Sequence, residues 1–252
     1  MSRPAPAPAP APAPGPAITL CCEIDHLVIA AASLAQGAAW CEAVLGVAPG
    51  PGGQHPLMGT HNRLLRIASP AFPLAYLEIL AIDTAAPLPG RARWFGLDDP
   101  ALQAALRVSP RLVGVVARTT DLDGLRQALL GLGIDPGPAL AAERDTPQGK
   151  LAWRIAVRDD GALPGGGRLP TLIQWQGRHP AEAMAPSPVA LGTVVLGRLA
   201  PAEALLLGLP GPGAAAGSSG APASSAAVPQ PRPALSVTLA TPRGLVTLST
   251  AA

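Results

Sequence analysis

The stretch Glu23-Ile24-Asp25-His26-Leu27-Val28-Ile29-Ala30 has the composition of a short, largely buried β-strand that carries one histidine. Side chains alternate between the two faces of a strand, so His26 is expected to share a face with Val28, and Asp25 to lie on the opposite face. Both faces are mostly apolar. We therefore expect a sheet that is covered on one side and lines a cleft on the other.

A helix and two further strands follow this stretch. Ser33 is suited to cap the helix, whose apolar residues recur at helical spacing until Gly46, a typical residue at a helix C-terminus. Strands are expected at 63–68 and 74–82, and the loop before them has room for a short additional strand. The second of these strands places Glu78 among apolar residues. An unpaired buried carboxylate is costly, so Glu78 needs a metal, a cationic partner or a bound proton.

The same order returns later in the chain. Residues 111–118 have the pattern of a strand, Asp121 is suited to cap a helix, and strands are expected at 151–157 and 171–176. Aligning the two helices places His26 on Gly114, so the chain contains a diverged internal repeat of strand, helix and strands. The expected fold class is therefore α+β.

The two ends of the chain differ in composition from its middle. Residues 1–18 are dominated by Pro and Ala and are expected to form a disordered tail, and 211–233 is expected to be a flexible linker. A domain is expected at 19–182, with modules at about 20–85 and 110–178. The remainder, 187–252, has the pattern of a strand, a short helix and a hairpin, as in a weaker and partial third module.

The overall composition excludes several classes of partner. The formal net charge is +2, and no basic cluster with interleaved aromatic residues is present, so we expect no nucleic-acid partner. Every apolar stretch is interrupted by Pro, Gly or charged residues, so we expect no membrane span. The three cysteines do not suggest a disulfide framework, which favours the cytoplasm. A monomer or homodimer is expected.

Several motifs, taken together with their order, resemble the vicinal oxygen chelate superfamily, and in particular its glyoxalase-like domains. The resemblance covers about residues 20–182, and it rests on the segments His55-Pro56-Leu57-Met58-Gly59-Thr60-His61-Asn62, Tyr76-Leu77-Glu78-Ile79, Arg93-Trp94-Phe95-Gly96 and Leu172-Ile173-Gln174-Trp175, besides the opening strand. It implies tandem βαβββ modules, as in glyoxalase, bleomycin-resistance and dioxygenase proteins. These modules would form a cupped mixed sheet, with a partial third module at the C-terminus.

The resemblance also implies a metal site. Members of the superfamily usually take one ligand from the first strand and one from the last strand of each module, which here are His26 and Glu78 in the first module. The second module offers Gly114, which has no side chain, and Gln174. Histidine and carboxylate suit Zn, Fe, Mn, Ni or Co. The implied protein is a divalent-metal-dependent isomerase, lyase or dioxygenase acting on a small oxygenated molecule, with Glu78 as catalytic base.

A second function fits the same residues. Gly114 and Gln174 are poor counterparts of His26 and Glu78, and this departure from the family pattern favours the alternative of a metal-free protein that binds or sequesters a small molecule.

Individual side chains also have structural interpretations. The alternative for Glu78 is an ion pair with an arginine such as Arg66 or Arg154, and the alternative for His26 is a buried, hydrogen-bonded position. The other candidates for the cleft or the substrate are His55, His61, Asn62, Arg154 and Gln174. For the two histidines and Asn62 the alternative is a role in holding their loop, and for Arg154 a solvated position. His179 is expected on a surface loop after the last strand.

Overall fold

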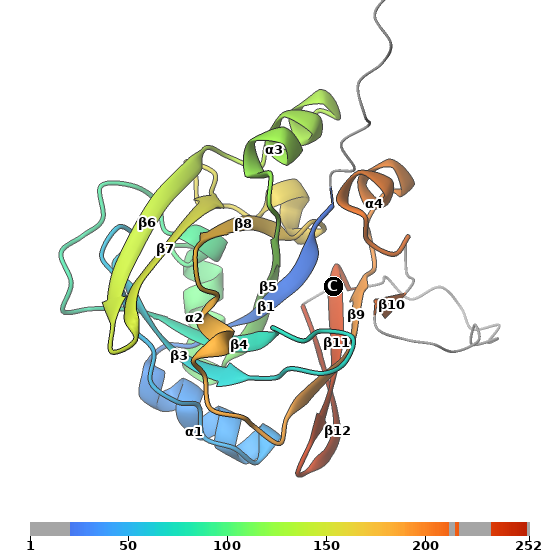
Figure 1. The fold of residues 1–252 in the computed structure, drawn as a ribbon. Coiled ribbons are helices and arrows are strands. Elements are labelled where there is room, and N and C mark those ends of the chain that lie inside the picture. Colours follow the sequence, from blue (N-terminus) through green and yellow to red (C-terminus); the bar gives the residue numbers. More distant parts are fainter. Residues whose placement is uncertain (1–20, 212–214, 217–232, 251–252) are drawn as a thin grey trace, which may run out of the picture.

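The computed structural model describes residues 21–211, 215–216 and 233–250 (Figure 1). The expected disordered tail and most of the expected linker lie outside these residues. No helix in the described part of the chain is long and apolar enough to cross a membrane.

One curved sheet of eight strands contains both modules, in the order β2-β3-β4-β1-β5-β8-β7-β6. Its strands are β1 (Glu23–Ala30), β2 (Gln54–His55), β3 (Thr60–Arg66), β4 (Tyr76–Ile82), β5 (Arg111–Arg118), β6 (Ala139–Thr146), β7 (Gly149–Ala156) and β8 (Thr171–Gln176). The two modules occupy the two halves of this sheet in mirrored order: β2-β3-β4-β1 from one edge corresponds to β6-β7-β8-β5 from the other. The two central strands, β1 and β5, are antiparallel, and each pairs in parallel with the last strand of its own module. The predicted tandem βαβββ fold is confirmed.

Two helices begin at the capping residues that the sequence analysis named, Ser33 and Asp121. Helix α1 (Leu34–Leu45) starts at Ser33, whose side chain accepts a hydrogen bond from the Gln36 amide, and ends at Gly46 with a φ of 77°. Helix α3 (Leu122–Gly131) starts in the same way, with the Asp121 side chain accepting from the amide of Gly124. Helix α2 (Pro100–Val108) connects the modules and was not predicted, although Asp99 caps it and Pro100 occupies its first turn.

Strand β6 was also missed by the sequence analysis. It is an edge strand in which exposed charged residues alternate with partly buried ones, so it lacks the apolar run that marks an interior strand.

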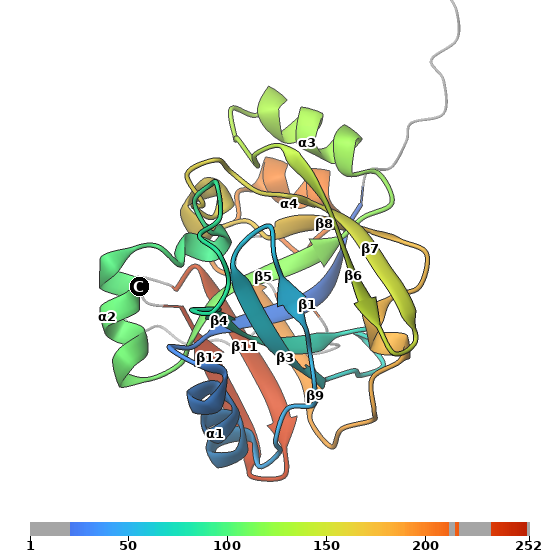
Figure 2. The same cartoon turned by 90° about the vertical axis from the view of Figure 1, so that its left-hand side faces the viewer.

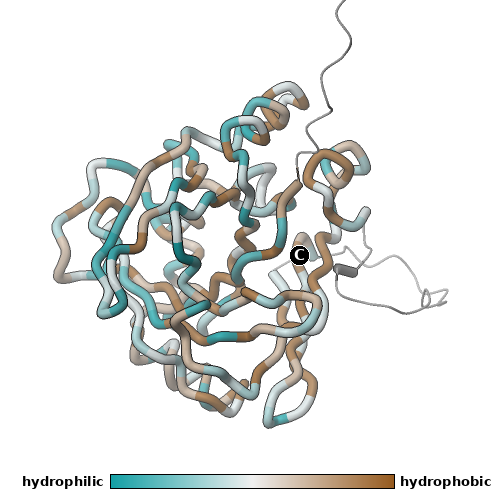
Figure 3. The backbone as a smooth tube through the Cα atoms, viewed as in Figure 1, coloured by the Kyte–Doolittle hydropathy of each residue, from teal (hydrophilic) through white to brown (hydrophobic). Residues whose placement is uncertain are grey.

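The two faces of the main sheet have separate apolar cores. On the convex face, residues such as Leu27 and Ile79 pack against α1 and against a second, four-stranded sheet. That sheet contains β9 (Ala190–Leu196), β10 (Ala215–Ala216), β11 (Leu235–Thr241) and β12 (Gly244–Ser249), and α4 (Pro201–Leu207) lies beside it (Figures 1 and 2). On the concave face, residues such as Val28, Trp153 and Ile173 pack against α2 and the turn at Trp94–Gly96. Figure 3 shows apolar residues, coloured brown, along strands of both sheets.

The C-terminal extension has the predicted order of strand, helix and hairpin, but its strands pair differently from those of the two modules. Its first strand, β9, lies between β10 and β11 and pairs antiparallel with both, whereas the first strand of each module pairs in parallel with the last. The extension therefore forms a smaller sheet of its own and does not continue the cupped sheet.

Candidate functional site

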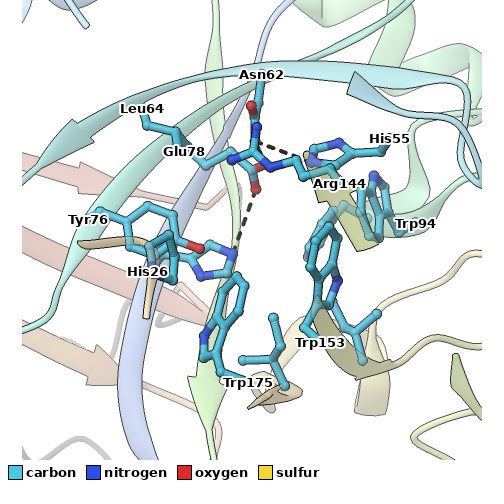
Figure 4. Close-up of a pocket in the computed structure, with 14 residues that line it drawn as sticks. His26, His55, Asn62, Leu64, Tyr76, Glu78, Trp94, Arg144, Trp153 and Trp175 are labelled. Carbon is cyan, nitrogen blue, oxygen red and sulfur yellow. Dashed lines mark hydrogen bonds and ion pairs between the residues drawn. The ribbon is translucent and has the colours of Figure 1, made fainter. Parts of the chain in front are cut away.

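His26 and Glu78 meet in a small cavity on the concave face of the main sheet (Figure 4). Parallel pairing of β1 with β4 places Val28 opposite Glu78 and His26 opposite Tyr76, so the two functional side chains leave neighbouring strands on the same side. His26 Nε2 lies 3.6 Å from Glu78 Oε2, and both side chains are more than nine-tenths buried. The cavity leaves about 40 Å³ for the centres of water-sized atoms. That is room for a few water molecules or a small chemical group.

A β-bulge at Asp25 changes the expected faces of the first strand. In the pairing of β1 with β5, Ile24 lies opposite Ala117 and His26 lies opposite Val116, which leaves Asp25 as an extra residue. A bulge re-aims the side chains beside it. Asp25 therefore lies on the same side as His26, while Ile24 packs in the convex core. The expectation that Asp25 lies on the opposite face from His26 is wrong for this reason.

Asp25 anchors the imidazole of His26. Its side chain is fully buried and accepts hydrogen bonds from His26 Nδ1 at 2.6 Å, His179 Nε2 at 2.9 Å and Trp175 Nε1 at 3.0 Å. Burial alone would raise the pKa of Asp25, but the hydrogen bonds from His179 and His26 outweigh it and hold this pKa well below its usual range. Asp25 is thus a permanent carboxylate behind His26.

The arrangement leaves two acceptors facing each other. When His26 Nδ1 donates to Asp25, a neutral imidazole presents only a lone pair at Nε2, and Glu78 Oε2 also presents lone pairs. Two such atoms 3.6 Å apart repel each other unless a positive charge lies between them. The pair is therefore built to share a proton or to hold a cation.

The other carboxylate oxygen of Glu78, Oε1, is held by Asn62 on β3. Asn62 Nδ2 donates to Glu78 Oε1 at 2.6 Å and also lies 3.3 Å from His55 Nε2. With its Nε2 accepting from Asn62, His55 donates from Nδ1 to Thr60 Oγ1, at 3.1 Å. Each hydrogen bond in this chain has one donor and one acceptor, so the orientation of the Glu78 carboxylate is defined.

His55 is expected to stay neutral throughout the physiological range. Burial lowers the pKa of His55 to about 4, against the opposing charge of Glu78. Histidines of the unfolded chain titrate near pH 6.5, so between about pH 6.5 and 4 the unfolded chain binds a proton at His55 that the folded protein does not. The free energy of unfolding therefore falls as the pH is lowered through this range. Imidazole NMR signals recorded between pH 3 and 8 should show a midpoint near 4 for His55. A midpoint near 6.5 would contradict the hydrogen-bonding scheme.

Aromatic rings close the cavity. Tyr76 stacks on the His26 ring at a centroid distance of 4.5 Å, and Trp94 contacts the His55 ring edge-on at 5.0 Å. Trp153 and Trp175 form the wall that belongs to the second module. Such walls lower the local dielectric constant and strengthen electrostatic effects at Glu78.

Three candidate residues do not line this cavity. His61 lies on the opposite face of β3 from Asn62, near Asp83. Arg154 binds both carboxylate oxygens of Asp123 on α3, at 2.8 and 3.0 Å. Gln174 donates to the carbonyl oxygen of Thr120. The strand faces in the second module are therefore opposite to those expected, because Trp153 and Trp175, and not Arg154 and Gln174, fill the concave side.

Two further site residues were missed by the sequence analysis. Asp25 is adjacent to His26, but the bulge that turns it inward leaves no mark in the pattern of apolar residues. His179, expected on a surface loop, is buried, and its Nδ1 accepts from the amide of Ala181 so that its Nε2 is left to donate to Asp25.

The described residues do not fit a tightly held metal ion. They contain no group of three or more His, Cys, Asp or Glu side chains arranged to bind one, and the residues outside them include none of these four types. The second module contributes no ligand. At the position equivalent to His26 it has Gly114, where an added Cβ would lie 3.3 Å from a side-chain atom of Leu163. At the position equivalent to Glu78 it has Thr171, which pairs with Val116 as Glu78 pairs with Val28. His26 and Glu78 remain as two ligands.

A comparison with models of protein families identifies the family of this chain. The family described as "Glyoxalase-like domain" matches residues 24–206, more than half of the chain. A hypothetical protein from Staphylococcus aureus has a similar structure, with 19% identity and a TM-score of 0.49 over 69% of each chain. No curated protein sequence matches the chain.

Two methylmalonyl-CoA epimerases are also similar in structure. A variant of the Streptomyces coelicolor enzyme, in complex with 2-nitronate-propionyl-CoA, has 17% identity and a TM-score of 0.38 over 62% of this chain and 94% of its own. The enzyme of Mycobacterium tuberculosis has 18% identity and a TM-score of 0.39 over 67% and 96%.

Proposed function

Because the chain belongs to the glyoxalase-like domain family of the vicinal oxygen chelate superfamily, we propose that it is an enzyme that moves a proton on a small oxygenated molecule. The observation that carries this proposal is the buried pair of His26 Nε2 and Glu78 Oε2, 3.6 Å apart, with the carboxylate of Asp25 behind the imidazole. A pair placed to share one proton is suited to general acid–base catalysis.

Each side chain has a distinct part in the proposed reaction. Glu78 accepts a proton from a carbon next to a carbonyl group, and the C–H electron pair moves onto the carbonyl oxygen to form an enolate. His26 holds the shared proton close to that oxygen and stabilises its negative charge, while Asp25 stabilises the imidazolium. In a 2-hydroxy carbonyl compound, His26 carries the hydroxyl proton to the first oxygen and Glu78 returns its proton to the former carbonyl carbon, which completes an isomerisation. Loss of a leaving group from the carbon next to the enolate would instead complete a lyase reaction. Asn62 keeps the carboxylate in position.

A metal-dependent form of this reaction has one observation in its favour. Histidines that bind metals commonly donate their other ring nitrogen to a carboxylate, as His26 does to Asp25. A divalent ion would supply Lewis-acid polarisation of the substrate oxygen. Because His26 and Glu78 are only two ligands, we expect such an ion to bind weakly.

Hydrogen exchange tests the proposal without knowledge of the product. Protein dialysed against EDTA should catalyse exchange of C–H for C–D in D₂O in at least one member of a panel of 2-oxo and 2-hydroxy compounds, with and without phosphate groups, followed by proton NMR. The metal content of the same sample should be well below one ion per chain.

Two other outcomes would contradict the proposal in different ways. Exchange that requires added Zn²⁺ or Mn²⁺ would establish the metal-dependent enzyme. Saturable binding of a panel member, without exchange in any member, would support the small-molecule binding protein.

A further inference from the structure

A second and much larger hollow opens beside the cavity that contains His26 and Glu78. We call it the vestibule; it has a volume of about 800 Å³, within the range of ligand sites. The vestibule and the cavity share Leu64, Arg144 and Pro180 as lining residues, so the two spaces are contiguous. A molecule in the vestibule can therefore extend a small group toward Glu78.

The lining of the vestibule is basic. It includes four cationic side chains and no Asp or Glu, and the four are Arg66, Arg144, Lys150 and Arg178. A hollow lined by one sign of charge concentrates ligands of the opposite sign.

The four cations differ in whether they already have partners. The two exposed ones lie next to carboxylates, Lys150 at 2.6 Å from Glu143 and Arg178 at 3.8 Å from Glu182. Arg66 and Arg144 are half-buried, and within the described part of the chain neither takes part in a hydrogen bond or an ion pair. Half-buried guanidinium groups whose donors have no protein acceptor are available to a ligand.

Strand geometry directs both arginines toward the concave side. Arg66 lies two residues beyond Leu64 on β3, and so projects from the same face as Leu64 and Asn62. Arg144 on β6 is paired with Leu151 of β7, so the two side chains lie on the same face of the sheet. Trp153, two residues beyond Leu151 on that face, lines the inner cavity. One arginine thus comes from each module, and Figure 4 shows Arg144 extending among the residues around Glu78 and His55.

The cavity and the vestibule differ in size, so each can hold a different part of one ligand. The inner cavity, with about 40 Å³ for atom centres, admits a reacting group of a few atoms. The vestibule has room for the larger part, and its basic lining favours an anion there.

We propose that the vestibule binds the anionic end of the substrate, and that this end is a phosphate group contacted by Arg66 and Arg144. Guanidinium groups match phosphate oxygens through paired, charge-assisted hydrogen bonds, and two of them balance a dianion. A carboxylate carries a single charge and matches one guanidinium. The identity of the reacting end rests on the proposed function, whereas anion binding does not.

Calorimetric titration with inorganic pyrophosphate tests the anion site. At constant ionic strength, wild-type protein should bind pyrophosphate more tightly than acetate. Arg66→Gln and Arg144→Gln should each weaken pyrophosphate binding about tenfold or more, since each removes a charge-assisted contact. Arg63→Gln serves as matched control, because Arg63 is an exposed arginine of the same strand on its opposite face.

The possible results separate this inference from the proposed function. Unchanged binding in Glu78→Gln, together with loss in the arginine variants, supports the anion site even if no hydrogen exchange is found. Equal pyrophosphate affinity in wild-type protein and in the double arginine variant would overturn the proposal. Acetate bound as tightly as pyrophosphate would overturn the assignment of a phosphate.

Discussion

Replacement of Glu78 by glutamine should lower the rate of hydrogen exchange by a factor of about 10²–10⁴, the usual contribution of a general base. Glutamine retains the shape of the side chain and still offers an oxygen to Asn62 Nδ2, which donates to Glu78 Oε1 at 2.6 Å. Its amide can donate to His26 Nε2, so the repulsion between two facing acceptors disappears. We therefore expect Glu78→Gln to remain folded, with a thermal midpoint no lower than that of the wild type.

The matched control for this substitution is Glu23→Gln. Glu23 is an exposed carboxylate on β1, paired with Arg118 and outside the cavity. Its replacement should leave the exchange rate unchanged. Wild-type exchange in Glu78→Gln would exclude Glu78 as the base, and a large fall in its thermal midpoint would show that Glu78 is mainly a structural partner.

Replacement of Asp25 by asparagine should produce the largest loss of stability. Asp25 is fully buried and accepts hydrogen bonds from His26, His179 and Trp175. An asparagine amide would point a donor at one of these donors and would remove the negative charge. Breaking a buried charged network typically costs about 3–5 kcal/mol, which urea denaturation at pH 7 can measure. Asp123→Asn, a change at an exposed carboxylate, should have little effect.

The pH dependence of this loss follows from the lowered pKa of Asp25. A carboxylate with a depressed pKa stabilises the folded state above the pKa of the unfolded chain, about 3.9, and this contribution falls as the pH is lowered through the folded value. The difference between wild type and Asp25→Asn should therefore be constant from pH 5 to 8 and should shrink below about pH 4. A difference that disappears already at pH 6 would show that Asp25 is not the permanent carboxylate.

The stability loss is separable from an effect on catalysis. Asp25 positions His26 without contacting the cavity space, so Asp25→Asn should also change the pH profile of hydrogen exchange in the fraction that remains folded. A purely structural role would lower the amount of active protein and leave that profile unchanged.

The sequence by itself determined the modular fold and one central pair of site residues. Helices α1 and α3 each have a capping residue next to an apolar stripe, and the strands of the first module have apolar runs. These elements therefore depend on short-range preferences that a local pattern contains. The sequence pattern assigned His26 to the first strand of the module and Glu78 to the last. These two strands pair in parallel, so the two side chains lie close together in the folded protein.

Only the tertiary structure decided which side chains surround that pair. A single extra residue at Asp25 turns its carboxylate to the concave side, and a change of one residue in register reverses every face of a strand. In β7, either set of alternating residues is compatible with the sequence, and the aromatic set is buried because the concave core covers it. The basic vestibule likewise exists only because β3 and β6, strands of different modules, face each other across the curved sheet.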